Sequence, residues 1–318
     1  MADNSDPRIR VADAPGIADA AKLLRGGGLV AVPTETVYGL AARADSEAAV
    51  AAIFRAKGRP DFNPLIVHVA GVDQAEALAQ FDLRARALAE AFWPGPLTMA
   101  LPLRSDSGLA PAVTAGLPTV ALRAPAHPAM RALMLATRLP IAAPSANRSG
   151  TVSPTTAAHV AASLPRGPGL ILDAGPSAGG IESTIVALRE GGGWDILRPG
   201  LVSAKAIAAV IGAAPQHPRS EQGIEAPGQL ARHYAPGKPL RLDAQSARPD
   251  EFMIGFALVQ GRVNLSPDGD LAEAAARLYA ALHLAAASPL ARIAVAPIPS
   301  NGIGEAINDR LRRAAMAE

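Results

Sequence analysis

Three polar segments of this chain carry residues that could do chemistry, and each adjoins an apolar run. PTETVYGL (33–40) crowds three hydroxyls and a carboxylate together, and KGRPDFNPLIVHV (57–69) begins with Lys57, followed closely by Arg59. APSANRSGTVSPT (143–155) is rich in serine, threonine and asparagine. Fixed cations beside hydroxyl and amide donors can gather and activate anionic reactants. Considered singly, the segments also fit a threonine-rich turn, basic residues at a helix C-terminus and serine capping of a helix.

The sequence lacks the residues or motifs that thiol chemistry, metal binding and the common nucleotide-binding loops require. The chain has no cysteine, which excludes thiol nucleophiles, disulfides and thiolate metal sites and fits a reducing compartment. Its six histidines lack the close spacing of zinc-binding helices, so no protein metal site is expected. GxxxxGK[ST] is absent, and neither GGG (26–28) nor GPSAGG (175–180) forms a GxGxxG motif. Any nucleotide is therefore bound by something other than a glycine-rich phosphate loop.

Size and charge set the general class of the protein. The 318 residues are 49% hydrophobic and 18% charged, which predicts a globular chain with two domains. The net charge of +2 is too small for a protein that coats nucleic acid, although it allows a local basic pocket. No apolar run approaches ~20 residues, and MADNSDPRIR does not read as a signal sequence. These features predict a soluble cytoplasmic protein without a membrane segment.

Alternating apolar runs and helical periodicities between about residues 16 and 212 predict an α/β domain that positions the polar segments. We expect strands at 29–32, 64–69, 96–101, 119–123, 140–143, 170–173, 183–188 and 194–197. We expect helices at 17–25, 46–57, 127–138, 155–163 and 203–211, the second of them capped by Ser46. Polar residues at strand ends are where α/β sheets place their ligand sites.

A change of composition marks a second part of the chain. Residues 212–239 are rich in proline and glycine with little apolar periodicity, which predicts a linker. Beyond it the segments 252–259, 271–286, 291–298 and 304–317 predict a β-α-β-α order. The expected domains are therefore 1–212, a linker or lid at 213–239, and a small α/β domain at 240–318.

Taken together, the polar segments resemble signature blocks of the YrdC-like family, and specifically its long two-domain threonylcarbamoyl-AMP synthases. The resemblance covers nearly the whole chain, except the first dozen residues, 213–226 and 241–270. Besides PTETVYGL, KGRP with NPLIVHV, and APSAN with SP, the matching blocks are WPGPLT (93–98), TVALR (119–123), PAHP (125–128), ESTIV (182–186), LRPG (197–200), HYAP (233–236) and GIGEAINDRLRRAA (302–315). It implies a twisted mixed sheet with flanking helices that form a concave basic cavity, plus a small Rossmann-like C-terminal domain.

The resemblance also implies an activity, that of a nucleotidyltransferase. Such enzymes make L-threonylcarbamoyladenylate from L-threonine, bicarbonate or CO₂, and ATP, and they release pyrophosphate. This synthesis is the first step of tRNA threonylcarbamoyladenosine modification. The implied participants are ATP with Mg²⁺ carried on it, threonine, bicarbonate and, as functional partner, the tRNA threonylcarbamoyl transferase complex. Direct tRNA binding is expected to be weak or secondary.

By the family pattern, a basic and polar set is catalytic, namely Lys57, Arg59, Ser145 and Asn147. The implied ATP contacts are Arg59, Asn63, Thr119, Ser145, Ser153, Arg198 and Tyr234. The implied threonine shell is Thr36, His68, Arg123, the Ala143 backbone and Ser183. Arg123 suits the threonine carboxylate because a guanidinium binds a carboxylate bidentately. No general base is assigned, and Thr34 and Glu35 share the first motif without a definite role.

Two further expectations accompany the resemblance. The carbamate and the mixed anhydride are labile in water, so residues 226–238, with Tyr234, are expected to cover the site. Only four of the 30 basic residues are lysines, and Lys57 alone among them lies in a signature block. A compact ammonium and a forked guanidinium are not interchangeable, which makes Lys57 the first position to mutate.

Two alternatives fit the sequence less well. Carbamoyl transfer in hydrogenase maturation also uses a YrdC-like domain, but together with cysteine-rich zinc fingers, which a chain without cysteine cannot form. A non-catalytic RNA-binding module would show a larger basic excess than 30 against 28 residues. Binding of threonine and ATP without tRNA would favour the enzyme, whereas steeply salt-dependent tRNA binding alone would favour the module.

Overall fold

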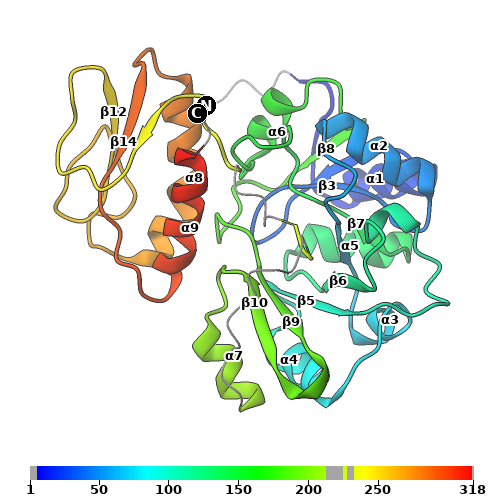
Figure 1. Cartoon of the computed structure of the whole chain (residues 1–318). Coiled ribbons are helices and arrows are strands. Elements are labelled where there is room, and N and C mark those ends of the chain that lie inside the picture. The colour runs from blue at the N-terminus through cyan, green and yellow to red at the C-terminus, as the bar shows by residue number, and fades with distance from the viewer. Residues whose placement is uncertain (1–5, 213–224, 228–232, 317–318) are drawn as a thin grey trace.

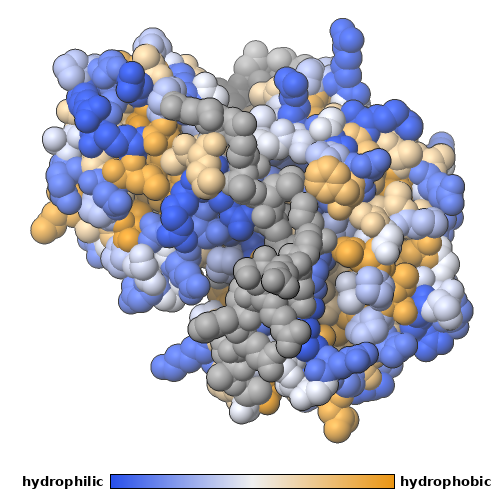
Figure 2. Space-filling view, viewed as in Figure 1, coloured by the Kyte–Doolittle hydropathy of each residue, from blue (hydrophilic) through white to orange (hydrophobic). Residues whose placement is uncertain are grey.

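Two β-sheets organise the protein, which is described here from a computed structural model over residues 6–212, 225–227 and 233–316 (Figure 1). In those ranges, each helix is too short or too polar to span a bilayer. On the face drawn in Figure 2, hydrophilic side chains cover most of the periphery and smaller hydrophobic areas lie between them.

The larger sheet is mixed, with parallel and antiparallel pairs. Its strands are β1 (Ile9–Val11), β2 (Val30–Val32), β3 (Gly39–Arg43), β4 (Ile66–His68), β5 (Leu97–Pro102), β6 (Thr119–Arg123), β7 (Ile141–Ala142), β8 (Leu170–Asp173), β9 (Thr184–Leu188) and β10 (Trp194–Arg198). They lie in the order β1-β8-β2-β3-β7-β4-β6-β5-β9-β10. For example, β2 runs parallel to β8 and antiparallel to β3, and β4 runs parallel to β6.

Helices cover both faces of this sheet. They are α1 (Ala14–Arg25), α2 (Glu47–Lys57), α3 (Val72–Glu76), α4 (Leu83–Phe92), α5 (Pro128–Thr137), α6 (Ala157–Ser163) and α7 (Ala204–Ile211). Apolar side chains of α1 and α5 bury one face of the sheet, and those of α2, α4, α6 and α7 bury the other. Ser46 caps α2 as predicted, because its side chain accepts a hydrogen bond from the backbone N–H of Ala49.

The smaller sheet is parallel and belongs to the C-terminal part. Its strands are β11 (Leu240–Arg241), β12 (Glu251–Gly255), β13 (Val263–Asn264) and β14 (Arg292–Val295), in the order β11-β14-β12-β13. Helices α8 (Leu271–Ala287) and α9 (Ile303–Ala315) lie between this sheet and the larger part (Figure 1). The predicted β-α-β-α order is present as β12, α8, β14 and α9, with β11 and β13 as additions.

The fold class predicted from the sequence is confirmed, while several elements were not foreseen. The sequence did not predict β1, β3, α3 or α4. The most informative of these is β3, because it pairs with β2 and makes the PTETVYGL segment the connection within an antiparallel pair. The start of that segment therefore lies at the end of one central strand and its last residues form the next. Part of the predicted linker, 213–224 and 228–232, lies outside the described residues.

Close packing joins the two parts. Val37, Val152 and Ile181 of the larger part share a buried cluster with apolar residues of α8 and α9. Gly180 has a φ of +69°, and a Cβ there would overlap the backbone of Ala275 in α8. Glycine is therefore required by its backbone conformation and by the close approach of α8. This contact fixes the segment just before β9 against the helices of the C-terminal part.

Candidate active site

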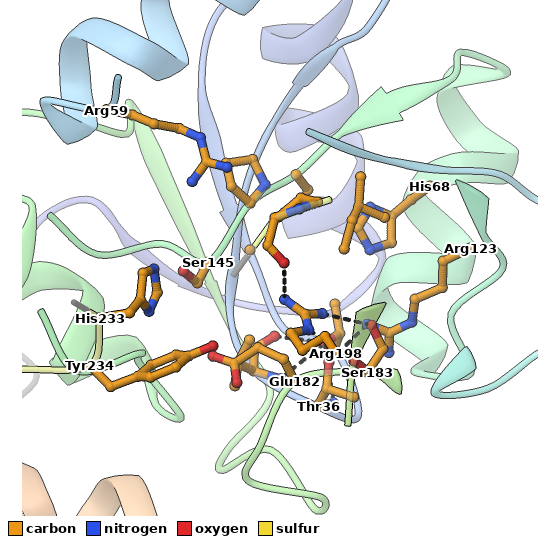
Figure 3. Close-up of a pocket in the computed structure, with 17 residues that line it drawn as sticks. Thr36, Arg59, His68, Arg123, Ser145, Glu182, Ser183, Arg198, His233 and Tyr234 are labelled. Atoms are coloured by element: carbon orange, nitrogen blue, oxygen red, sulfur yellow. Dashed lines mark hydrogen bonds between the residues drawn. The ribbon is translucent and has the colours of Figure 1, made fainter. Parts of the chain in front are cut away.

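A polar cavity lies at the junction of the two parts, where several segments end (Figure 3). Its walls come from the β2–β3 connection, β4, β6, the loop after β7, the residues before β9, and the end of β10. The space between its walls, counting the solvent at its open mouth, is about 570 Å³. The predicted site residues that line it are Thr36, Arg59, His68, Arg123, Ala143, Ser145, Ser183, Arg198 and Tyr234.

Three arginines dominate the electrostatics of the cavity. Figure 3 shows Arg198 near its middle, with Arg59 and Arg123 on opposite sides. Arg59 follows the left-handed Gly58 cap of α2 and donates from Nη2 to the Pro64 carbonyl at 2.8 Å. Burial, reinforced by the charge of Arg198, lowers the pKa of Arg59 to about 10. The guanidinium is still charged at neutral pH, so it can bind an anion.

The third arginine, Arg123, ends β6 and organises the first motif. Its Nη1 donates to the Thr36 hydroxyl at 2.9 Å, and its Nη2 donates to Glu35 Oε1 at 2.6 Å. Burial works against ionisation of Glu35, but the charge and hydrogen bond of Arg123 hold the pKa of that carboxyl below its ordinary value. The Thr34 hydroxyl lies 2.9 Å from that of Thr36 and accepts from the Val37 N–H at 3.2 Å. The threonine-rich turn thus presents an ordered hydroxyl to the cavity.

Lys57 does not line the cavity; its side chain binds the loop after β7, which carries Ser145. The side chain is buried at the end of α2, and Nζ donates to the carbonyl oxygens of Ser145 at 2.5 Å and Asn147 at 2.6 Å. Burial and the nearby charge of Arg59 lower the pKa of this ammonium well below its ordinary value. Asn147 also holds this loop, since Nδ2 donates to the Thr151 carbonyl at 2.8 Å. Both residues act here on the loop that brings Ser145 to the cavity.

The other predicted ATP contacts, Asn63, Thr119 and Ser153, are not among the residues that line the cavity. Asn63 is buried, and within the described residues neither atom of its side-chain amide has a hydrogen-bond partner. Such a group is a candidate for a polar ligand, because an unpaired buried amide is costly. Thr119 lies at the opposite end of β6 from Arg123, paired in register with Pro102. Ser153 is fully buried and donates to Glu182 Oε1 at 2.6 Å.

Two residues that line the cavity, Glu182 and His233, were not among the predicted site residues. Glu182 begins the ESTIV block and is buried, yet its role depends on partners in the C-terminal part. His233, beside Tyr234 in HYAP, lines the cavity with Pro227. Their presence in matching blocks was the available signal, but nothing in either block indicated the direction of the side chain.

We expect acid to destabilise the protein through buried histidines. Burial, reinforced for His68 by the nearby Arg123, lowers the pKa values of His68 and His233 from the ordinary 6.5 to about 3. Below pH 6.5 the unfolded chain therefore takes up protons that the folded chain refuses, so stability falls as the pH falls toward 3. At pH 5 each such histidine should cost on the order of 2 kcal/mol of unfolding free energy.

Urea unfolding at pH 7.5 and pH 5 measures this loss. His68→Gln should shrink the difference between the two pH values, because glutamine does not titrate. His127→Gln, at a half-buried helix cap, is the comparison and should change the difference less. An equal difference in wild type and His68→Gln contradicts the prediction.

Two family models match the chain. The model of the Sua5, YciO and YrdC proteins, described as "Telomere recombination", matches residues 22–200. A second model, described as "Threonylcarbamoyl-AMP synthase, C-terminal domain", matches residues 202–316. The two matches follow one another along the chain and together reach nearly from end to end.

Named relatives agree with these models. Threonylcarbamoyl-AMP synthase of Bacillus subtilis is 42% identical over 330 residues, covering 95% of this chain and 93% of that protein. The enzyme of the same name from Pyrococcus abyssi is 40% identical and covers 93% of each chain. A crystal structure of P. abyssi Sua5 complexed with L-threonine superposes with a TM-score of 0.86 at 37% identity, over 95% of this chain and 94% of that one. The chain therefore belongs to the threonylcarbamoyl-AMP synthase family, in its two-domain form.

Proposed function

We propose that this chain condenses L-threonine, bicarbonate or CO₂, and ATP into L-threonylcarbamoyladenylate and pyrophosphate in the cavity described above. The observation that carries the proposal is the gathering of three arginines around one cavity: Arg123 and Arg198, which are buried, and Arg59, which is partly buried. ATP, bicarbonate and the threonine carboxylate all bring negative charge to one place. Fixed cations can hold such reactants together without reorganising during the reaction.

The proposed reaction has two bond-forming steps. The threonine amine attacks the carbon of bicarbonate, water leaves, and a carbamate forms. A carbamate oxygen then attacks the α-phosphorus of ATP, and the bond to pyrophosphate breaks. The cavity contributes by orienting the three reactants and by compensating charge on the phosphates. His68 is neutral at pH 7, because its pKa is about 3, so it can orient the amine without repelling it.

We assign threonine to the side of the cavity around Arg123, with Thr36, His68, the Ala143 backbone and Ser183. The support is that these residues all line the cavity and that Arg123 and Thr36 are already joined by a hydrogen bond. The proposed nucleotide contacts are Arg59, Asn63, Thr119, Ser145, Ser153, Arg198 and Tyr234. Lys57 and Asn147 are proposed as positioning residues, since their side-chain donors bind backbone carbonyls of the loop that carries Ser145.

Mg²⁺ is proposed to enter with ATP as part of the substrate. The two carboxylates at the cavity, Glu35 and Glu182, each bind an arginine. Over the ranges that the structure covers, no group of three or more histidine or acidic side chains is close enough to hold a metal ion.

We also propose a separate role for each of the three parts of the chain. Residues 1–212 would carry the chemistry, 213–239 would cover the site, and 240–318 would support it. The support for a cover is that Pro227, His233 and Tyr234 line the cavity. The proposed consumer of the product is a tRNA threonylcarbamoyl transferase complex, and the proposed location is the cytoplasm, because the end product is a modified tRNA.

Mass detection of the adenylate is the direct test. The full-length protein is incubated with threonine, ¹³C-bicarbonate, ATP and Mg²⁺, and we expect a product that carries both threonine and the ¹³C label. Pyrophosphate release should require threonine and bicarbonate together, and omission of either is the matched control. Pyrophosphate release that is independent of threonine, or tRNA binding without any adenylate, would contradict the proposal.

A further inference from the structure

The C-terminal helix α9 delivers a fully buried arginine to the rear of the cavity. Arg310 has an exposed fraction of 0%, and each of its nitrogens is bonded. Nε donates to Glu182 Oε2 at 2.9 Å, Nη1 to Asp309 Oδ2 at 2.6 Å, and Nη2 to the Pro199 carbonyl at 2.9 Å. A buried guanidinium is costly unless it finds acceptors, and each of the three nitrogens of Arg310 has one.

Glu182, its main partner, lines the cavity and accepts hydrogen bonds from three side chains. Ser153 donates to Oε1 at 2.6 Å, and Tyr279 of α8 donates to Oε2 at 2.8 Å beside Arg310. Burial works against the charge, but Arg310 and then Arg198 hold the pKa of Glu182 at about 2. The carboxylate is therefore ionised, and two of its three donors come from the C-terminal part.

Arg198 is the second cation near this carboxylate, yet it is not paired with it. Its donors bind neutral oxygens, the Ser183 carbonyl and hydroxyl at 3.1 Å each and the Pro227 carbonyl at 3.4 Å. Within the described residues, no carboxylate lies within 4.0 Å of Arg198 as an ion pair, although Glu182 directly precedes its partner Ser183. The positive charge of Arg198 is thus left available to the cavity.

The arrangement is a competition between two arginines for one carboxylate. In a buried, low-dielectric setting an ion pair is strongly favoured over separated charges, so Glu182 would turn to Arg198 if Arg310 were absent. An Arg198 paired with Glu182 would attract a phosphate less strongly than an unpaired one. Arg310 prevents that pairing by holding Glu182 from behind, with Tyr279 and Ser153 on the same group.

We propose that Arg310 is a positioning residue for the nucleotide pocket: it holds the Glu182 carboxylate away from Arg198, which leaves the Arg198 charge for the ATP phosphates. The C-terminal part thereby sets the charge of a cavity built mainly by the larger part. The proposal rests on the proposed function only in assigning Arg198 to ATP. Arg310 itself touches no reactant, because Glu182 and Tyr234 lie between it and the cavity.

Steady-state kinetics and ATP titration of full-length variants test the idea. Arg310→Met keeps an apolar side chain beside the Tyr234 ring, which lies 5.3 Å from the Arg310 guanidinium carbon, but it releases Glu182. We expect the KM for ATP to rise roughly tenfold and the KM for threonine to change little. In Arg310→Met with Glu182→Gln the KM for ATP should return close to that of Glu182→Gln alone, because an amide cannot neutralise Arg198.

This rescue separates a positioning role from a merely structural one. If Arg310 only stabilised the fold, a second substitution in the same cluster would raise the KM for ATP further instead of lowering it. Arg312→Met, at an exposed arginine of α9, is the matched control and should leave both KM values unchanged. If Arg310→Met fails to fold by circular dichroism, the comparison of the double variant with Glu182→Gln still decides, because neither contains a released carboxylate. A KM for ATP about tenfold higher in the double variant than in Glu182→Gln overturns the inference. A wild-type KM for ATP in folded Arg310→Met also overturns it, whereas an inactive wild-type protein would overturn the proposed function instead.

Discussion

Replacing Lys57 with methionine should lower the rate of threonylcarbamoyladenylate formation by about 100-fold or more. Methionine has a similar length but no donor, so the carbonyls of Ser145 and Asn147 would lose the ammonium that joins them. Two buried carbonyls without that partner favour a displaced loop. Ser145 would then leave its place in the cavity wall, and a shift of about 1 Å is enough for a loss of this size.

Lys22→Met, at an exposed position of α1, is the matched control and should keep the wild-type rate. Pyrophosphate release measures activity, and circular dichroism establishes that each variant is folded. Lys57→Arg should not restore the rate, because the longer, planar guanidinium cannot occupy the site of a compact ammonium. A folded Lys57→Met protein with near wild-type activity would remove Lys57 from the functional set.

The sequence predicted strands that contain adjacent buried β-branched residues, such as β4 (Ile66–His68) and β9 (Thr184–Leu188). It did not predict β3, since GLAAR consists mainly of small residues with little strand preference. Helix α4 was missed because two of its three buried positions are alanines, which leaves a faint apolar stripe. β11 and β13 have two residues each, too few to show a period.

Within the site, the resemblance supplied residues that lie inside signature blocks, but not the partners that orient them. Lys57 illustrates the limit: its block was recognised, whereas the two carbonyls that it binds lie 88 and 90 residues away. Lys238 is another example, because Nζ binds the carbonyls of Ala285 and Ser288 at the end of α8, and nothing in the linker sequence indicated this. Such contacts depend on how distant segments pack, and no local pattern records that.

The threonine carboxylate gives the second large prediction, at Arg123. Arg123→Met should raise the KM for threonine about 100-fold and alter the KM for ATP far less, because a buried charged partner is lost on the threonine side only. The loss has two components. The positive charge and the N–H groups that Thr36 and Glu35 do not use are no longer offered to the carboxylate, and Glu35 loses the ion pair that held its negative charge, so it repels the substrate.

Combining Arg123→Met with Glu35→Gln separates these components. The double variant removes the repulsion without restoring the fork, so its KM for threonine should fall between those of wild type and Arg123→Met. Arg123→Lys keeps the charge without the fork and should also be intermediate, since an ammonium cannot reach Thr36 and a carboxylate in the same plane. Threonine titration by calorimetry checks the binding directly. A rise in the KM for ATP with unchanged threonine binding would move Arg123 to the nucleotide side and reverse the two ends of the cavity.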